Sequence, residues 1–137
     1  MIRFTVYGVP VSQGNKTPFT FRDKNSGKVR ASMSERNNKG LEAWRHDVSM
    51  IAQQHRPDKP YDGPVAVTLR FFFIRPKSVS EKKRPLPIVK PDIDKITRAI
   101  FDALKGKIYT DDSRVCDLIT SKRYDDTPRV EIEVEEL

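Results

Sequence analysis

The residues best suited to chemistry are the carboxylates at the two ends of one short segment, PDIDKITRAIFDALKGKIYTDD, at positions 91–112. Asp92 and Asp94 stand near its start, and an Asp111–Asp112 pair closes it. Mg²⁺ prefers hard oxygen ligands, and sites that act on phosphates usually combine one or two carboxylates with the substrate. Carboxylates that converge from separate elements can hold ions that activate water for phosphodiester cleavage. The segment therefore predicts a divalent-metal site.

These carboxylates also have a purely structural explanation. An Asp at the start of a helix commonly caps it or interacts with its dipole. An Asp-Asp pair before Ser is an ordinary turn sequence. Spacing alone leaves both interpretations open, and the charge of the surrounding chain favours the metal site.

A short amphipathic helix is expected to position the carboxylates. Apolar residues recur every three or four positions, and Gly106 follows where a helix commonly ends. Because a helix of about a dozen residues is about 18 Å long, the chain must fold back along it to bring Asp111 or Asp112 to Asp92 and Asp94. The apolar positions are Ile93, Ile96, Ile100 and Leu104, with Phe101 beside them.

The order of these residues carries a resemblance. The sequence holds Asp92-Ile93-Asp94, then Arg98, Phe101-Asp102-Ala103-Leu104 and Asp111-Asp112. This resembles the RusA family of Holliday junction resolvases, whose pattern is roughly D-x-D-N, a basic residue, F-D-A-L and D-D. The resemblance is strong over 90–117 and looser toward the turn at 10–13 and the C-terminal strands. It implies a small, homodimeric, Mg²⁺-dependent endonuclease, with Mn²⁺ as a substitute, that nicks four-way DNA symmetrically in recombination and repair.

The resemblance also implies roles for individual residues. Two positions depart from the family pattern: Lys95 stands where the family often has Asn, and Arg98 where the best-known pattern has Lys. Because a guanidinium does not release its proton in proteins, Arg98 is expected to stabilise phosphate charge without transferring a proton. The implied metal ligands are Asp92, Asp94 and Asp112, with Asp111 beside them.

The charge of the chain favours a polyanionic partner. It holds 26 Lys and Arg against 19 Asp and Glu, a formal net charge of +7, and such an excess most often marks nucleic-acid binding. Cations gather in a hairpin around a turn at 23–27 and in a proline-bearing loop, 75–90, directly before Asp92. A basic loop beside carboxylates is expected to attract a phosphodiester to metal ions bound there. The alternative is an ordinary solvated loop. The predicted nucleic-acid-binding residues are Lys16, Arg22, Lys24, Lys28, Arg30, Arg75, Lys77, Lys82, Lys83, Arg84, Lys90 and Lys95.

The remaining pattern predicts one small α+β domain over residues 1–137, with a mixed or antiparallel sheet of about four or five strands and two helices. A second helix is expected from Ser34–Glu35 to His55, with Ser34 as its cap. Phe72 points away from the buried side of its strand and is expected to be half-buried, under a partner subunit. The expected strands are 2–7, 17–22, 28–31, 64–74, 115–124 and 129–135.

Other functional classes are less consistent with the sequence. The single cysteine, Cys116, excludes an intramolecular disulfide and a cysteine-rich zinc site and fits a reducing cytoplasm. No apolar run approaches the roughly 20 residues that cross a bilayer, so a soluble, cytoplasmic protein is expected. The alternatives are a non-catalytic basic DNA- or RNA-binding module, in which Asp92 only caps a helix, and a D-x-D transferase. The lack of a Gly-rich phosphate loop argues against the transferase.

Two further pairs of side chains were assigned from their context. Phe19 and Phe21 share one face of the basic hairpin, so they either pack on the body of the protein or stack on DNA. His46 and His55 have no ligand at metal spacing and are expected to be structural or on the surface.

Overall fold

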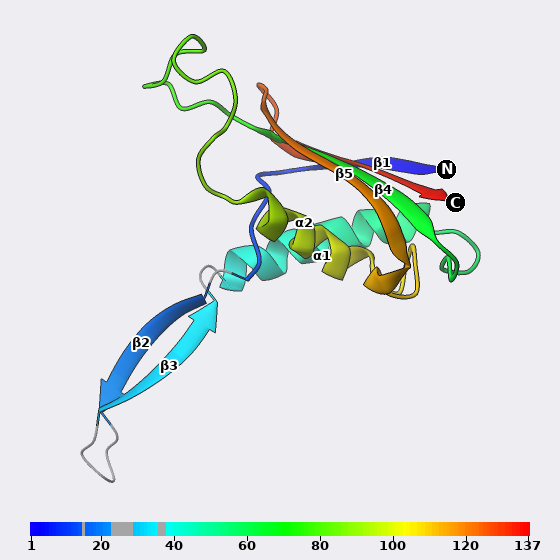
Figure 1. Cartoon of the computed structure of the whole chain (residues 1–137), viewed down its shortest axis with the longest axis horizontal. Helices are drawn as coiled ribbons and strands as arrows, with labels where there is room; N and C mark the ends of the chain where they lie inside the picture. Colours follow the sequence, from blue (N-terminus) through cyan, green and yellow to red (C-terminus); the bar gives the residue numbers. More distant parts are fainter. Residues whose placement is uncertain (15, 23–28, 36–37) are drawn as a thin grey trace.

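The structure is a computed structural model that describes residues 1–14, 16–22, 29–35 and 38–137, with side chains described for 1–14 and 40–137. A four-stranded sheet carries two helices on one face, and a two-stranded sheet lies apart from it (Figure 1). This confirms the predicted α+β class. The elements are β1 (Ile2–Tyr7), β2 (Lys16–Arg22), β3 (Val29–Glu35), α1 (Asn38–His55), β4 (Val65–Phe73), α2 (Ile93–Leu104), the 3₁₀ turn η1 (Asp112–Arg114), β5 (Val115–Tyr124) and β6 (Arg129–Glu136).

The four-stranded sheet is mixed, in the order β1-β6-β4-β5. Strand β6 pairs antiparallel with both β1 and β4, whereas β4 and β5 are parallel. A parallel pair requires a crossover, and α2 supplies it between β4 and β5. Strand β5 therefore returns antiparallel to α2 and forms one edge of the sheet (Figure 1).

The core lies between the sheet and the two helices. Alternate residues of β4 face the helices and are fully buried, as the period of two predicted. The Thr97 and Thr120 hydroxyls, 3.0 Å apart, hydrogen-bond α2 to β5. Helix α2 is therefore fixed on its inner side along its length. Its buried residues are Ile96, Thr97, Ala99, Ile100, Ala103 and Leu104.

Helix α1 begins at Asn38, so the prediction that it starts at Ser34–Glu35 with Ser34 as cap is wrong. Both residues belong to β3, where Ser34 lies opposite Thr17 of β2. Pairing with β2 satisfies the backbone there, which a pattern read along the chain does not reveal. The hairpin itself is confirmed, with a longer second strand; its turn at 23–27 and the side chains of Phe19 and Phe21 lie outside the described part.

The outer face of the sheet carries several charged side chains that pair with one another. The Arg129 guanidinium lies 3.9 Å from the Phe72 ring centroid, a cation–π contact that half-buries Phe72 within its own chain. Arg3 and Arg70 each contact Glu133, at 3.0 and 3.2 Å. Burial of Phe72 under a partner stays a prediction. None of the described helices has the length and apolar character needed to span a membrane.

Replacement of Ile100 by Ala tests the packing of α2. Ile100 is 0% exposed, and truncation of such a residue typically lowers the free energy of unfolding by about 2–5 kcal/mol. Met50→Ala is the matched control, because Met50 is 51% exposed on α1 and should cost no more than about 0.5 kcal/mol. Urea unfolding measures both; equal losses would contradict the buried position of Ile100.

Candidate active site

The first acidic group lies at the start of α2. Asp92 directly precedes the helix in an extended conformation, and its side chain makes no capping hydrogen bond. It accepts instead from Lys95 Nζ at 3.1 Å. That hydrogen bond, with the nearby charges of Lys95, Lys90 and Lys122, lowers the pKa of Asp92. The carboxylate therefore stays ionised and is not used as a helix cap.

Asp92 and Asp94 line an open groove together with two lysines, Lys90 and Lys122. Residues 87–89 form its other wall. Lys122 Nζ donates to the carbonyl oxygens of Val89 at 2.8 Å and Pro91 at 2.9 Å, which fastens the end of the basic loop to β5. Carboxylates and ammonium groups thus share one surface, the combination expected where a phosphate and a cation bind together.

The second acidic group lies beyond the other end of α2. Asp111 accepts from the Ser113 N–H at 3.0 Å and pairs with Lys105 Nζ at 3.0 Å. Hydrogen bonds from Ser113 and Lys105 hold the pKa of Asp111 far below its usual range. Asp112 differs: its Oδ1 is buried without a hydrogen-bond partner among the described residues. Burial and the neighbouring Asp102 raise the pKa of Asp112.

Helix α2 keeps the two acidic groups apart. It has 12 residues, which corresponds to about 18 Å. Asp112 interacts with Asp102 and Lys105 at the end of the helix, whereas Asp92 interacts with Lys95 in the first turn. Within the described part of the chain, no three Asp, Glu, His or Cys side chains form a group able to hold a metal ion. One chain therefore brings Asp92 and Asp94 together but not Asp112, and the three-ligand assignment stays a prediction.

The loop after β1 lies along the outer side of α2. The Gln13 backbone N–H donates to the Lys95 carbonyl at 3.0 Å, and the Gln13 side-chain amide donates to the Asp102 carboxylate. Arg45 of α1 donates to Gln13 Oε1 at 3.0 Å. Gln13 therefore joins α1 and α2 on the side of the helix that carries the candidate charged residues.

Gly14 brings the same loop against Arg98. Its φ is +92°, and a Cβ added there would lie 2.6 Å from Arg98 Nη1. Only glycine adopts such a φ readily while leaving this space free. The loop thus limits where the exposed Arg98 guanidinium can lie.

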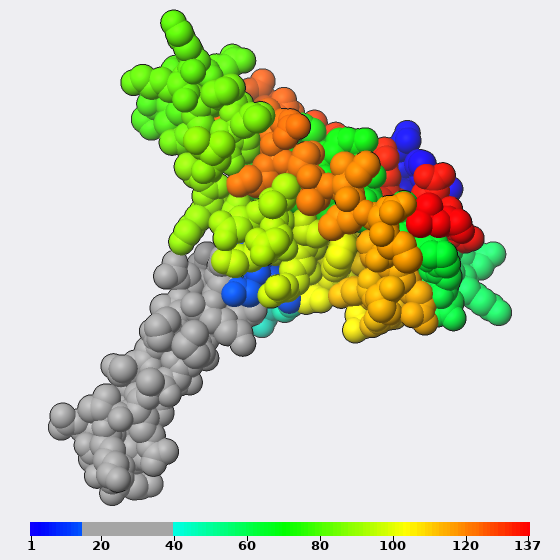
Figure 2. Space-filling view, viewed as in Figure 1, coloured from blue at the N-terminus to red at the C-terminus, as the bar shows by residue number. Residues whose placement is uncertain are grey.

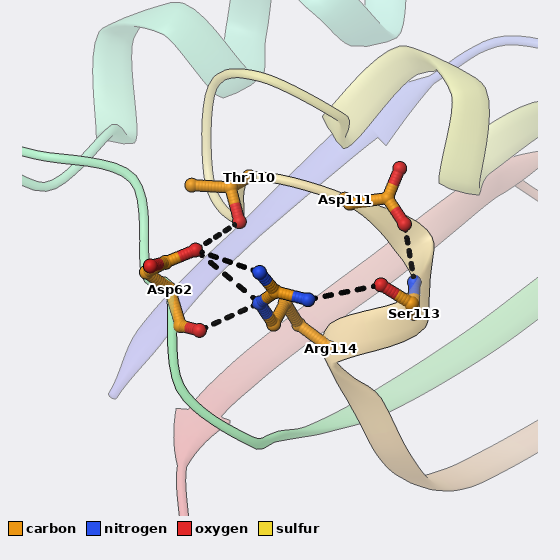
Figure 3. Close-up of polar contacts among 5 residues, drawn as sticks. All are labelled: Asp62, Thr110, Asp111, Ser113 and Arg114. Atoms are coloured by element: carbon orange, nitrogen blue, oxygen red, sulfur yellow. Dashed lines mark hydrogen bonds and ion pairs between the residues drawn. The ribbon is translucent and has the colours of Figure 1, made fainter.

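A polar cluster fixes the segment that carries Asp111 and Asp112 (Figure 3). Asp62 Oδ1 accepts from Thr110 Oγ1 at 2.7 Å and from Arg114 Nη2 at 3.0 Å. Arg114 Nε also donates to the Asp62 carbonyl oxygen at 2.6 Å. The hydrogen bonds from Thr110 and Arg114 lower the pKa of Asp62. The acidic turn is therefore anchored on both sides to the loop before β4.

Two of the predicted DNA-binding residues, Arg75 and Arg84, make contacts that stabilise the basic loop. Arg75 donates to the carbonyl oxygens of Arg84 at 3.1 Å and Pro85 at 3.3 Å, and its guanidinium lies 4.6 Å from the Tyr124 ring centroid. Arg84 contacts the Tyr124 hydroxyl at 3.4 Å. The exposed lysines of the loop are Lys77, Lys82, Lys83 and Lys90. The side chains of Lys16, Arg22, Lys24, Lys28 and Arg30 lie outside those described.

Several residues of this site were missed by the sequence reasoning. Lys122 gave no local signal, because its position beside Asp92 depends on the parallel pairing of β4 and β5. The pairing of Asp62 with Arg114 spans 52 positions. Gln13 lies in the turn at 10–13, which is part of the family resemblance. That resemblance is the sequence signal that could have indicated its role.

The chain matches the family described as Endodeoxyribonuclease RusA over residues 8–135. This span contains both acidic groups, the basic loop and the whole of α2. The chain therefore belongs to the RusA family of endodeoxyribonucleases, as the resemblance predicted.

Two relatives extend the comparison. The chain is 36% identical over 146 aligned residues to the uncharacterized protein YqaN of Bacillus subtilis strain 168, which covers 99% of this chain and 96% of the relative. It is 24% identical over 126 residues to the crossover junction endodeoxyribonuclease rusA of Lactococcus phage r1t, covering 90% of this chain and 93% of the phage protein. In both cases the similarity extends over nearly the whole chain and is not confined to one motif.

Replacement of Asp62 by Ala tests the anchoring of the acidic turn. Without the carboxylate, Thr110 and Arg114 lose their shared acceptor, so backbone amides at 111–114 should exchange with solvent faster. The pKa of Asp62 is lowered in the folded protein, so its carboxylate stays ionised down to strong acid. The difference in exchange between wild type and variant should therefore be full near neutral pH and disappear only in strong acid.

Asp58→Ala, at an exposed position of the same loop, should leave this exchange unchanged. Hydrogen exchange read by mass spectrometry makes the comparison. Equal protection of 111–114 in both variants would show that Asp62 does not anchor the turn.

Proposed function

We propose that the protein is a divalent-metal-dependent endonuclease that resolves four-way DNA junctions by paired nicks in recombination and repair. The observation that carries the proposal is the groove in which Asp92 and Asp94 lie beside Lys90 and Lys122, in a chain of the RusA family. The phage relative is named a crossover junction endodeoxyribonuclease, which supports the choice of substrate.

The residues that would hold Mg²⁺ or Mn²⁺ are Asp92, Asp94 and Asp112, with Asp111 adjacent. Asp92 is not used as a cap, and Asp112 has an oxygen that receives no hydrogen bond among the described residues. Both properties fit metal ligation, although a single chain keeps the two groups apart. When bound, the ion supplies an activated water and polarises the scissile phosphate.

The cations of the chain bind and orient the DNA. Lys90, Lys95 and Lys122 surround Asp92 and attract a phosphodiester into the groove. Arg98 stabilises the negative charge that develops on the phosphate, because its guanidinium can donate two parallel hydrogen bonds. The exposed lysines of the basic loop contact the DNA backbone and so position the substrate without reading its sequence.

Paired cuts in a four-way junction require two identical sites related by a two-fold axis, so the proposal includes a homodimer. A cytoplasmic location also stays a prediction, supported by the single cysteine, Cys116. The second candidate function is a non-catalytic DNA-binding module. The separation of Asp112 from Asp92 within one chain favours it, and an assay for nicking distinguishes the two.

The direct test is cleavage of a synthetic four-way junction with and without Mg²⁺. The wild type should nick only with the metal. The nicking rate should fall by at least about 100-fold in each of the variants Asp92→Asn, Asp94→Asn and Asp112→Asn, because loss of a residue that only supports a metal ligand already costs up to about 100-fold. Gel-shift affinity without metal should change little. Asp47→Asn, at an exposed position of α1, is the control. A fully active Asp94→Asn would reject the ligand assignment.

The lysines of the basic loop should determine how steeply binding depends on salt. Each phosphate contact contributes about −0.9 to the slope of log affinity against log salt concentration. The double variant Lys82→Ala, Lys83→Ala should therefore reduce the magnitude of the slope by about 1.8. The control is Lys59→Ala, at an exposed position of the loop before β4. Fluorescence anisotropy measures both, and an unchanged slope would remove these lysines from the interface.

The substitution Gly14→Ala should slow nicking because it displaces the Arg98 guanidinium. The added Cβ would approach Arg98 Nη1 to 2.6 Å, so the guanidinium must move, and the positive φ adds about 1–3 kcal/mol of strain. We expect a several-fold lower single-turnover rate with unchanged junction affinity. Gly63→Ala is the control, because no atom lies within 4 Å of its added Cβ. A wild-type rate for Gly14→Ala at a temperature where it is folded would contradict a positioning role.

A further inference from the structure

The basic loop, 75–90, changes character just before it reaches the groove. Its first part carries exposed lysines, whereas its last part, the apolar segment 86–89, does not. Leu86 is 45% exposed, Ile88 82% and Val89 44%. Three large apolar side chains within four consecutive positions form contiguous apolar surface, which folded proteins expose mainly where they bind a partner.

The apolar segment is fastened at both ends. Just before it, Arg75 donates to the carbonyl oxygen of Pro85 at 3.3 Å. At its end, Lys122 Nζ donates to the carbonyl oxygen of Val89 at 2.8 Å. These hydrogen bonds restrain the backbone on both sides, so little ordering is needed when the exposed side chains contact a ligand.

A tight turn directs one of these side chains outward. The Ile88 N–H donates to the Leu86 carbonyl oxygen at 2.9 Å, which closes a three-residue turn around Pro87. Pro87 is buried, and its ring fixes the φ angle at the centre of the turn. The turn leaves Ile88 the most exposed of the large apolar side chains in the described part of the chain.

Ile88 lies in the same groove as the candidate metal ligands. It lines the groove together with Asp92 and Asp94, and with Lys90 and Lys122. Figure 2 shows the basic loop, in light green, standing out from the body of the molecule. An aliphatic side chain, two carboxylates and two ammonium groups therefore share one open surface.

This combination of side chains matches interrupted DNA. The ammonium groups attract the anionic backbone, and an exposed aliphatic side chain requires an apolar surface to contact. A continuous duplex keeps the faces of its bases stacked on one another, whereas a branch point breaks the stack. Side chains such as Ile and Leu insert between base steps in proteins that distort DNA. The apolar segment therefore fits a branch point better than a regular duplex.

We propose that Ile88 is an apolar wedge that inserts between the bases at the branch point and holds them unstacked, next to the phosphodiester that enters the groove. This inference rests on the proposed function and identifies the feature of the DNA that its site selects.

The wedge gives the groove a preference for branched DNA. Insertion costs the stacking of the bases that it separates, and this cost is least where pairing or stacking is already disturbed. The lysines of the loop contact any DNA backbone and do not discriminate in this way. Ile88 therefore determines structural selectivity, while the lysines determine general affinity.

The base analogue 2-aminopurine tests the insertion without cleavage, because its fluorescence rises when it is unstacked. It is placed at the branch point of a synthetic four-way junction, which is then saturated with protein in the absence of divalent metal. The wild type and Ile88→Leu should raise the fluorescence several-fold, and Ile88→Ser should not. Ile74→Ser is the control, because Ile74 is 58% exposed directly before the same loop, and it should behave as the wild type.

Two outcomes of this measurement overturn the wedge. One is a wild type that binds the junction without a rise in fluorescence, and the other is an equal rise with Ile88→Ser. Light scattering should give the same mass for the wild type and Ile88→Ser. A lower mass for the variant would show that the apolar segment contacts a second copy of the chain, which also overturns the wedge.

A junction with mismatched bases at the branch point separates insertion from a merely structural role of Ile88. Ile88→Ser should nick the fully paired junction several-fold more slowly than the wild type. It should nick the mismatched junction at about the wild-type rate, because those bases are already unstacked. Equal slowing on both junctions would overturn the wedge. A wild type that raises the fluorescence but nicks neither junction with Mg²⁺ or Mn²⁺ defeats the proposed nuclease function and leaves the wedge supported.

Discussion

The packing of α2 is the constraint on which the rest of the structure depends. Its inner face is buried against α1 and the sheet, so the helix neither shortens nor tilts freely. A packed helix of 12 residues holds whatever precedes it about 18 Å from whatever follows it. Asp92 and Asp112 are therefore held at opposite ends of the helix within one chain.

Each acidic group is held by parts of the chain that are distant in sequence. Lys122 of β5 fixes the backbone before Asp92, and Asp62 with Arg114 fixes the turn that carries Asp112. Gln13 and Gly14 lie between them, along α2. The positions of the carboxylates are thus set mainly by hydrogen bonds to loops and an edge strand. Such preorganisation is what a functional site requires of the residues that form it.

The features that could be predicted from the sequence were those set by short-range patterns, such as single helices and strands. The period of Ile96, Ile100 and Leu104 predicted α2, and strict alternation predicted β4, because one buried face imposes each pattern. The predicted start of α1 was wrong, because pairing with β2 extends strand β3 over the residues that were expected to begin the helix. The chain was expected to fold back along the helix and so unite the carboxylates. It does fold back, but the return begins at Val115, after Asp112, so the acidic turn stays at the far end. No local pattern encodes that position.

The most direct measurement is the location of a bound ion in crystals grown with Mn²⁺ and examined by anomalous diffraction. The account predicts an anomalous peak ligated by Asp92 and Asp94, in the groove that they line with Lys90 and Lys122. Crystals in which Mn²⁺ binds elsewhere on the protein and not at Asp92 and Asp94 would contradict it.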